Sequence, residues 1–324
     1  MFKRLRILGL AAACAALIAP LAAAAAWPDK PIRIVVPYAA GGPTDAMARI
    51  LEAPLREALG TPIIVENVPG ASGALGAQQV LRAAADGYTL FLGNNGPSAV
   101  TPLLLRTAAF DPIKDFQPLS MVAKATMVLA ASKDVPATDM KSFVAYVKAH
   151  PGQLNYASAG SGSLGHLGSE LLLQEAGLAM THVPYKGQAP TLNALLAGDV
   201  QMLLTTPTEA MRAHAAAGKI KLIAVTSDSP SPFDPKADLV RNAVPGYTLY
   251  SWFALLARTG TPADVAARLT SAINAAVVND EVRRKFAALG IVAEAGQPQD
   301  VANFIRQDVT RWSAIIRERH IQSD

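Results

Sequence analysis

The feature that most constrains this chain is a buried strand that runs straight into a glycine turn and a helix. Residues 34–36 (IVV) are β-branched and apolar on both faces, as in a strand enclosed within a parallel sheet. After the turn at 37–42, apolar residues recur with helical spacing until Gly60, which is typical of an amphipathic helix and its end. A buried strand followed at once by such a helix predicts an α/β fold.

The turn has the composition of an anion-binding corner. Gly41 and Gly42 allow positive φ and leave their N–H groups uncovered, while Thr44 or Asp45 can cap the helix that follows. A helix N-terminus presents unpaired amides and a partial positive charge to one point in space. We therefore interpret this turn as half of a site for a small anion, although many α/β proteins use such a turn only as a corner.

A second copy of the same arrangement lies far along the chain. Residues 154–166 (LNYASAGSGSLGH) again predict a strand, a small-residue turn and a helix. Both copies carry Tyr-Ala ahead of glycine. If the two turns face each other across a cleft, a carboxylate can be held from both sides.

The elements around each turn predict two similar lobes. Strands expected at 63–65 and 88–92 alternate with helices, which requires a parallel sheet, and each ends in a loop rich in Gly, Asn and Ser. The same rhythm restarts from 154 to 225. Ligands of open α/β sheets bind at the carboxyl ends of the strands, where these loops gather. Three C-terminal helices are expected to pack on the first unit.

The first 26 residues have the pattern of a secretory signal. A basic start at residues 1–6 precedes an alanine-rich apolar run with small residues at Ala24 and Ala26, so we predict cleavage before Trp27. A membrane anchor is the alternative, which Pro20 and the weak insertion of alanine disfavour. Cys14, the one cysteine, lies within this segment, and lipidation there is a minor alternative. An exported chain without cysteine fits the bacterial periplasm.

The charge of the mature chain excludes a polyanionic partner. The formal net charge is +4, but Lys3, Arg4 and Arg6 leave with the signal, and 26 basic side chains then face 25 acidic ones. No basic run with interleaved aromatic residues is present. We expect no nucleic-acid binding and a small ligand.

The motifs resemble those of one known family. In order along the chain they are 37–45 (PYAAGGPTD), 65–73 (VENVPGASG), 86–90 (DGYTL), 111–116 (DPIKDF), 156–158 (YAS) with His166, 182–187 (HVPYKG) and 224–226 (AVT). Together they closely resemble the Bug (TctC-like) family of tripartite tricarboxylate transporter receptors.

This resemblance implies a two-lobed periplasmic binding protein, monomeric, that closes on a small carboxylate and delivers it to two membrane permease subunits. An orphan sensory or scavenging protein without a permease is the alternative, because many relatives stand apart from permease genes. The family also implies lobe boundaries, with 27–122 and 227–324 in the first lobe and 123–226 in the second.

The residues that we expect to contact the ligand lie on the two glycine turns and on the loops beside them. We expect no catalytic residue, metal ligand or cofactor. The candidate ligand-binding residues are Tyr38, Ala39, Ala40, Gly41, Gly42, Thr44, Asp45, Ser72, Asn94, Ser158, Ala159, Gly160, Ser161, Ser163, His166, Tyr185 and Thr205.

Two other site chemistries fit the second turn less well. Gly160, Gly162 and Gly165 match a dinucleotide fingerprint, but the next strand, 181–186, lacks the acidic residue that would bind a ribose. Serines near His166 suggest a hydrolase of small esters, yet no Gly-x-Ser-x-Gly elbow is present. The five histidines show no metal-ligand spacing.

The chain departs from the family pattern in two places. Residues 227–245 lack the family's Leu-Pro-x-Val-Pro-Thr segment, which leaves the contribution of that region to the site open. Thr205 and Thr206 stand where many relatives have an aspartate able to hold an amine. We therefore expect a ligand without an amino group at that point.

Overall fold

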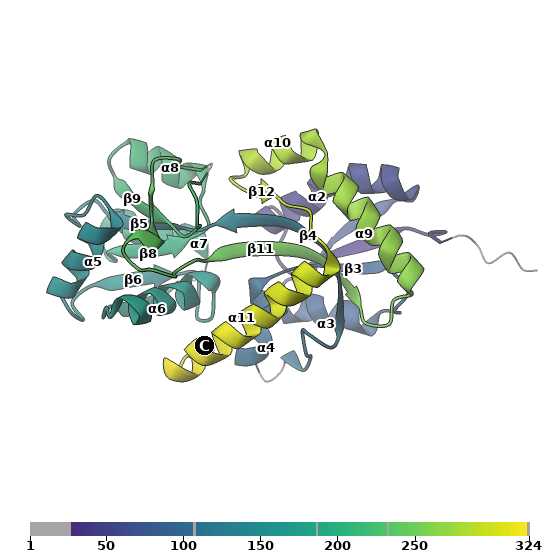
Figure 1. The fold of residues 1–324 in the computed structure, drawn as a ribbon, viewed down its shortest axis with the longest axis horizontal. Helices are drawn as coiled ribbons and strands as arrows, with labels where there is room; N and C mark the ends of the chain where they lie inside the picture. The colour runs from purple at the N-terminus through teal and green to yellow at the C-terminus, as the bar shows by residue number, and fades with distance from the viewer. Residues whose placement is uncertain (1–26, 106–107, 186, 232, 323–324) are drawn as a thin grey trace, which may run out of the picture.

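The computed structural model describes residues 27–322 except 106, 107, 186 and 232. The chain forms two lobes, each a six-stranded sheet with helices around it (Figure 1). The predicted α/β two-lobed fold is thus confirmed. The predicted signal segment and Cys14 lie outside the described residues.

The first sheet has the strand order β12-β4-β11-β3-β1-β2. Its parallel part is β1 (Ile32–Val36) between β2 (Ile63–Asn67) and β3 (Thr89–Asn94). Its antiparallel part is β11 (Tyr250–Arg258), β4 (Phe116–Thr126) and β12 (Val292–Ala293). Strand β1 is enclosed on both faces, because Ile34 and Val36 pack on one side and Val35 on the other.

The second sheet repeats this plan in the order β10-β9-β5-β8-β6-β7. Here β6 (Asn155–Ser158) lies parallel between β7 (Thr181–Pro184) and β8 (Met202–Thr205). The antiparallel β5 (Val128–Ser132) follows, then β9 (Ile220–Val225) and β10 (Asp238–Leu239). Strands β1 and β6 therefore occupy equivalent positions, and each leads into one of the glycine turns.

Helices cover both sheets. In the first lobe they are α2 (Pro43–Leu59), α3 (Ala74–Arg82), the short α4 (Thr101–Leu104), α9 (Ala263–Val278) and α10 (Asp280–Ala288). In the second they are α5 (Met140–Ala149), α6 (Leu164–Ala176), α7 (Gln188–Ala197) and α8 (Glu209–Ala216). Among the described residues no helix is both long and apolar enough to cross a bilayer.

The chain passes between the lobes at Met127 and again just before Tyr250. Strand β4 pairs with β11 as far as Thr126, and β5 begins in the other sheet at Val128. The return comes late because apolar residues at 240–249 fill the core of the second lobe, next to the short β10. Judged by strand pairing, the chain thus changes lobes at Met127 and before Tyr250, rather than after residues 122 and 226 as the family resemblance implies.

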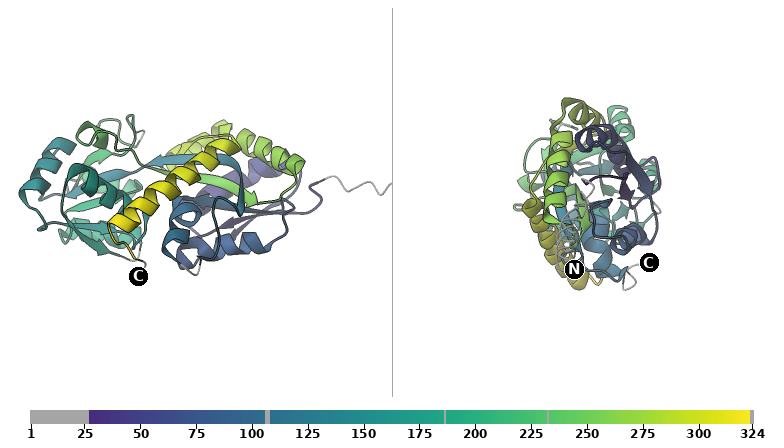
Figure 2. Two further views of the ribbon diagram at one scale, coloured as in Figure 1. Left: turned by 60° about the horizontal axis from the view of Figure 1, so that its bottom comes forward. Right: turned by 90° about the vertical axis from the view of Figure 1, so that its right-hand side faces the viewer.

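The last helix, α11 (Pro298–Glu318), lies across both lobes (Figure 2). Val301 and Ile305 pack into the first lobe, whereas Trp312 and Ile315 pack into the core of the second. The expectation that all three C-terminal helices pack on the first unit is wrong for α11, because 21 residues of amphipathic helix reach about 30 Å.

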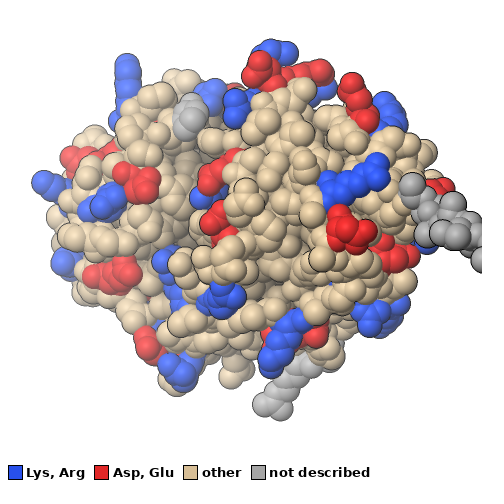
Figure 3. Space-filling view, turned by 45° about the vertical axis from the view of Figure 1, so that its right-hand side comes forward, with Lys and Arg blue, Asp and Glu red and all other residues tan. Residues whose placement is uncertain are grey.

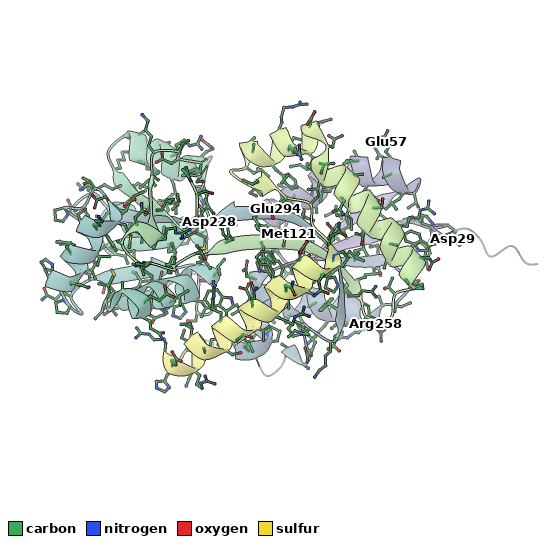
Figure 4. All side chains as sticks on the ribbon, viewed as in Figure 1. Asp29, Glu57, Met121, Asp228, Arg258 and Glu294 are labelled. Carbon is green, nitrogen blue, oxygen red and sulfur yellow. The ribbon has the colours of Figure 1, made fainter. Side chains whose placement is uncertain are left out.

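Polar side chains flank the passages between lobes. The Tyr250 hydroxyl donates to Asp228 Oδ1 at 2.8 Å, and Glu294 pairs with Lys124 on the first-lobe side (Figure 4). On the face shown in Figure 3, basic and acidic side chains are interspersed. No single sign of charge dominates that face.

A buried carboxylate joins three elements where the lobes meet. Asp308 Oδ2 on α11 accepts the Trp252 indole N–H from β11 at 2.7 Å and the Asn95 side-chain amide at 2.7 Å. Asn95 Oδ1 in turn accepts the Trp252 main-chain N–H at 3.0 Å. Burial raises the pKa of Asp308 against the opposing effect of these hydrogen bonds.

We expect Asp308→Ala to lower the free energy of unfolding by about 2–4 kcal/mol, because two buried donors lose their acceptor. Asp308→Asn keeps an acceptor oxygen and should cost far less. Urea titration at pH 7 measures both. Since the pKa of Asp308 is raised in the folded state, the wild type should gain stability relative to Asp308→Asn as the pH falls toward 4. Equal losses in the two variants would contradict this role.

Candidate functional site

A cavity of about 780 Å³ lies between the lobes, within the range of small-molecule sites. Both glycine turns contribute to its wall, so Gly41 and Gly160 face the same space. Of the predicted residues, the cavity is lined by Tyr38, Ala39, Ala40, Gly41, Gly42, Thr44, Ser72, Asn94, Ala159, Gly160, Ser161, Ser163 and Thr205. Contact of these residues with a ligand stays a prediction.

The first turn is braced from below by Asp45. Gly41 has φ of 86°, and Gly42 caps α2 through extended backbone without a side-chain cap. Asp45 Oδ2 accepts the Gly41 N–H at 2.9 Å and Arg49 Nε at 3.1 Å. Burial acts to raise the pKa of Asp45, but the hydrogen bonds from Arg49 and Gly41 outweigh it and hold the pKa below its ordinary value. Asp45 does not line the cavity, because its carboxylate is turned to the Gly41 N–H and to Arg49.

The second turn is braced in the same way by other groups. Ser158 Oγ accepts the Gly160 N–H at 3.3 Å, and His166 Nδ1 accepts the Gly162 N–H at 3.0 Å. Ser163 Oγ caps α6 by accepting the His166 main-chain N–H. Ser158 and His166 are buried and do not line the cavity, contrary to expectation. Both side chains shape the turn from behind.

Tyr185 is the fourth predicted residue outside the cavity wall. Its ring packs against the second-lobe core that contains Ala157 and Leu203. Its main chain approaches the turn, because its N–H donates to the Ser158 carbonyl oxygen at 2.9 Å and its own carbonyl oxygen lies 3.7 Å from the position that a Cβ on Gly160 would take. The aromatic wall of the cavity comes from Tyr38 and Phe253 instead.

The main-chain amides of the two turns divide into two sets. Those of Gly41, Gly160 and Gly162 are used inside the protein, so the expectation that the Gly41 amide is uncovered is wrong. The second set belongs to residues that line the cavity and has no protein acceptor among the described residues, and these are the amides of Ala40, Gly42, Thr44, Ala159, Leu164 and Gly165. The last two belong to the first turn of α6, where a helix leaves its N–H groups unpaired.

Further polar groups complete the wall. The Tyr38 hydroxyl donates to Asn94 Oδ1 at 2.9 Å, and burial raises the pKa of Tyr38 to about 12, so the phenol is neutral at physiological pH. Sequence reasoning missed Thr101, Gln188 and Ser251, because no local pattern marks residues that only the packing of the lobes brings to the cavity.

Charged side chains are absent from the cavity wall within the described part of the chain. The described residues also hold no group of three His, Asp or Glu side chains arranged for a metal ion. An anion bound here would therefore be held by amides and hydroxyls rather than by an ion pair.

The lobes touch at the edge of the cavity. A Cβ on Gly162 would lie 2.2 Å from Leu104 Cδ1, so the main chain of the second turn rests on α4 of the first lobe. Ala99 and Val100, just before α4, are buried with the second-lobe core. The structure thus has the lobes closed at this point.

Comparison with known proteins identifies the family. Residues 47–321 match the family model described as tripartite tricarboxylate transporter family receptor. The chain belongs to this family. A curated relative, the protein BugT of Bordetella pertussis, is 32% identical over 320 residues and covers 98% of each chain. The predicted resemblance is thus confirmed, and members of this family are periplasmic solute-binding proteins.

Two solved structures of Rhodopseudomonas palustris proteins are similar over nearly the whole molecule. Rpa4515, solved with adipate, is 33% identical with a TM-score of 0.79, over 92% of this chain and 100% of that one. MatC, solved with bound malate, is 33% identical with a TM-score of 0.75, over 90% and 100%. The family and the fold are therefore shown independently by sequence and by structure.

A matched pair of glycine variants tests how tightly the second turn is fixed. A Cβ on Gly165 would lie 2.4 Å from the Leu204 carbonyl oxygen, whereas one on Gly42 would meet nothing nearer than 3.8 Å. We expect Gly165→Ala to cost about 1–3 kcal/mol, as overpacking does, and Gly42→Ala to cost less than about 0.5 kcal/mol. Thermal melting without ligand measures both, and equal melting temperatures would show that the turn is not so constrained.

Proposed function

We propose that this protein is exported to the periplasm, binds a small organic acid between its lobes and delivers it to a two-subunit membrane permease. One observation carries the proposal: two topologically equivalent turns, each with main-chain amides that have no protein acceptor, line one cavity without a charged side chain among the described lining residues. Amides in this arrangement suit a carboxylate. The adipate and malate bound to Rpa4515 and MatC support the same ligand class.

The free energy needed for micromolar binding requires hydrogen-bond donors from both lobes. A helix dipole contributes only ~0.3–1 kcal/mol to a nearby anion, or ~2 when partly buried. Micromolar affinity needs about 8 kcal/mol. Hydrogen bonds to a charged group add roughly 1.5–3 kcal/mol each, so three to five convergent donors are needed. Each turn supplies at most the lower end of that number, and closure of the lobes brings the two sets together.

An enzymatic function is disfavoured by the geometry behind the second turn. In a hydrolase, His166 would hold its imidazole toward a serine hydroxyl as a base. Instead, Nδ1 accepts the Gly162 N–H, and Ser163 Oγ accepts the main-chain N–H of His166. We propose that the protein turns nothing over. A binding protein that serves a sensor rather than a permease remains the second candidate, because the cavity is the same in both.

Thermal melting against a panel of mono-, di- and tricarboxylates tests the ligand class. At 100 times Kd a ligand should add ~2.7 kcal/mol, because it binds only the folded state. We expect at least one acid to raise the melting temperature by about 5–10 °C and to remain chemically unchanged on incubation. Matching alcohols or amides that lack the carboxylate are the control. No shift with any acid, or conversion of the acid, would contradict the proposal.

Thr205 and Thr206 line the cavity, and no carboxylate stands among the described lining residues, so an ammonium group would find no carboxylate partner there. We expect succinate to bind at least tenfold more tightly than aspartate, measured by isothermal calorimetry. Thr205→Asp should reverse this preference by pairing the ammonium group and repelling the second carboxylate. Tighter binding of aspartate to the wild type would refute the expectation.

A further inference from the structure

The second turn is backed by two stacked imidazoles. His166 on α6 and His182 on β7 have ring centroids 3.7 Å apart and ring planes within 12° of parallel. His166 is 5% exposed, and neither ring lines the cavity. The pair therefore lies behind the ligand-facing main chain, between it and the body of the second lobe.

A main-chain N–H fixes the protonation state of His166 in this conformation. The Gly162 amide donates to His166 Nδ1 at 3.0 Å. An amide nitrogen can only donate, so Nδ1 must carry a lone pair, and an imidazolium with N–H on both nitrogens cannot take this place. The observed turn thus exists only with His166 neutral.

The second imidazole, that of His182, contacts the residue at the start of the turn, Ser158. His182 Nε2 lies 2.7 Å from Ser158 Oγ, the atom that accepts the Gly160 N–H. The ring of Tyr156 stacks on His182 with centroids 5.0 Å apart. The amides of both glycines are thus tied to one connected group of side chains.

Two ionisable side chains close to the histidine pair, Tyr156 and Glu170, have partners within the protein. The Tyr156 hydroxyl donates to Glu170 Oε1 at 2.5 Å, and Glu170 Oε2 pairs with Arg319 of α11. Burial and the adjacent Glu170 raise the pKa of Tyr156, so the phenol stays neutral. Glu170 pairs with Arg319, and imidazole is the side chain whose unperturbed pKa lies nearest to neutral pH.

We propose that His166 is a positioning residue that links ligand binding to protons. The inference rests on the proposed function of the turns. Protonation sets an N–H of the imidazole against the N–H of Gly162, which forces the turn to move at Gly162 and shifts the main chain of Gly162 and Ser163 that lines the cavity. The affinity for the organic acid is therefore highest while His166 is neutral and falls as the pH drops and His166 is protonated. We expect this loss of geometry to outweigh the added positive charge, because neither imidazole lines the cavity.

Two measurements test the proposal. Ring nitrogen NMR of histidine-labelled protein should show His166 at pH 7.5 with Nδ1 unprotonated and Nε2 protonated. Calorimetric titration with adipate and with malate at pH 6.0, 6.75 and 7.5 should show Kd rising at least fivefold more in the wild type than in His166→Asn. The side-chain oxygen of asparagine can accept the Gly162 N–H without titrating. The ionisation of the acids themselves cancels in this comparison.

Further variants separate positioning from folding. His166→Leu removes the acceptor and should bind more weakly than His166→Asn at pH 7.5, with both variants showing a cooperative melt. His150→Asn is the matched control, because His150 Nδ1 contacts only the Tyr146 carbonyl oxygen at the far end of α5, and its pH dependence should follow the wild type.

Some outcomes overturn the inference alone. A His166 ring protonated on Nδ1 at pH 7.5, equal pH dependence in wild type and His166→Asn, or tighter binding on acidification would each do so. Failure of the protein to bind either acid or any member of the carboxylate panel overturns the proposed function, and the ring tautomer then still decides whether His166 holds the turn.

Discussion

The structure depends on where a few main-chain N–H groups point. Amides are weak donors one at a time, and they bind an anion only when several converge on it. In each turn the protein fixes that direction by tying down alternate amides: Asp45 holds Gly41, Ser158 holds Gly160, and His166 holds Gly162. Among the described residues that line the cavity, the amides of Ala40, Gly42, Thr44, Ala159, Leu164 and Gly165 have no protein acceptor. The polar side chains behind the wall thus matter as much as those in it.

The second requirement is that two half-sites meet. Passages at Met127 and before Tyr250 join the sheets, and α11 packs on both lobes. Asn95 lines the cavity and at the same time bonds Asp308 and the main chain of β11. The floor of the cavity is therefore physically continuous with the contacts that set the angle between the lobes. The contact between the Leu104 side chain and the main chain of Gly162 is a further point at which the two lobes touch.

Sequence reasoning found both turns of the candidate cavity because each turn is local in the sequence. A strand, a glycine turn and a helix N-terminus are contiguous, so the two turns could be found and paired by their shared pattern. It failed where a side chain had two directions to choose from. Asp45, Ser158 and His166 sit within the motifs, yet each turns inward to accept a main-chain N–H. The contributions of Thr101, Gln188 and Ser251 needed the packing of the lobes and left no local signal.

By itself the sequence determined the α/β class, the two-lobed plan, the family and the two turns, because hydrophobic periodicity and glycine placement act over a few residues and are readable in order. Tertiary structure alone decided which amides remain available, where the chain changes lobes and how α11 spans them. Those outcomes follow from competition among distant groups for the same donors and the same apolar surface, and a linear pattern does not record which partner wins.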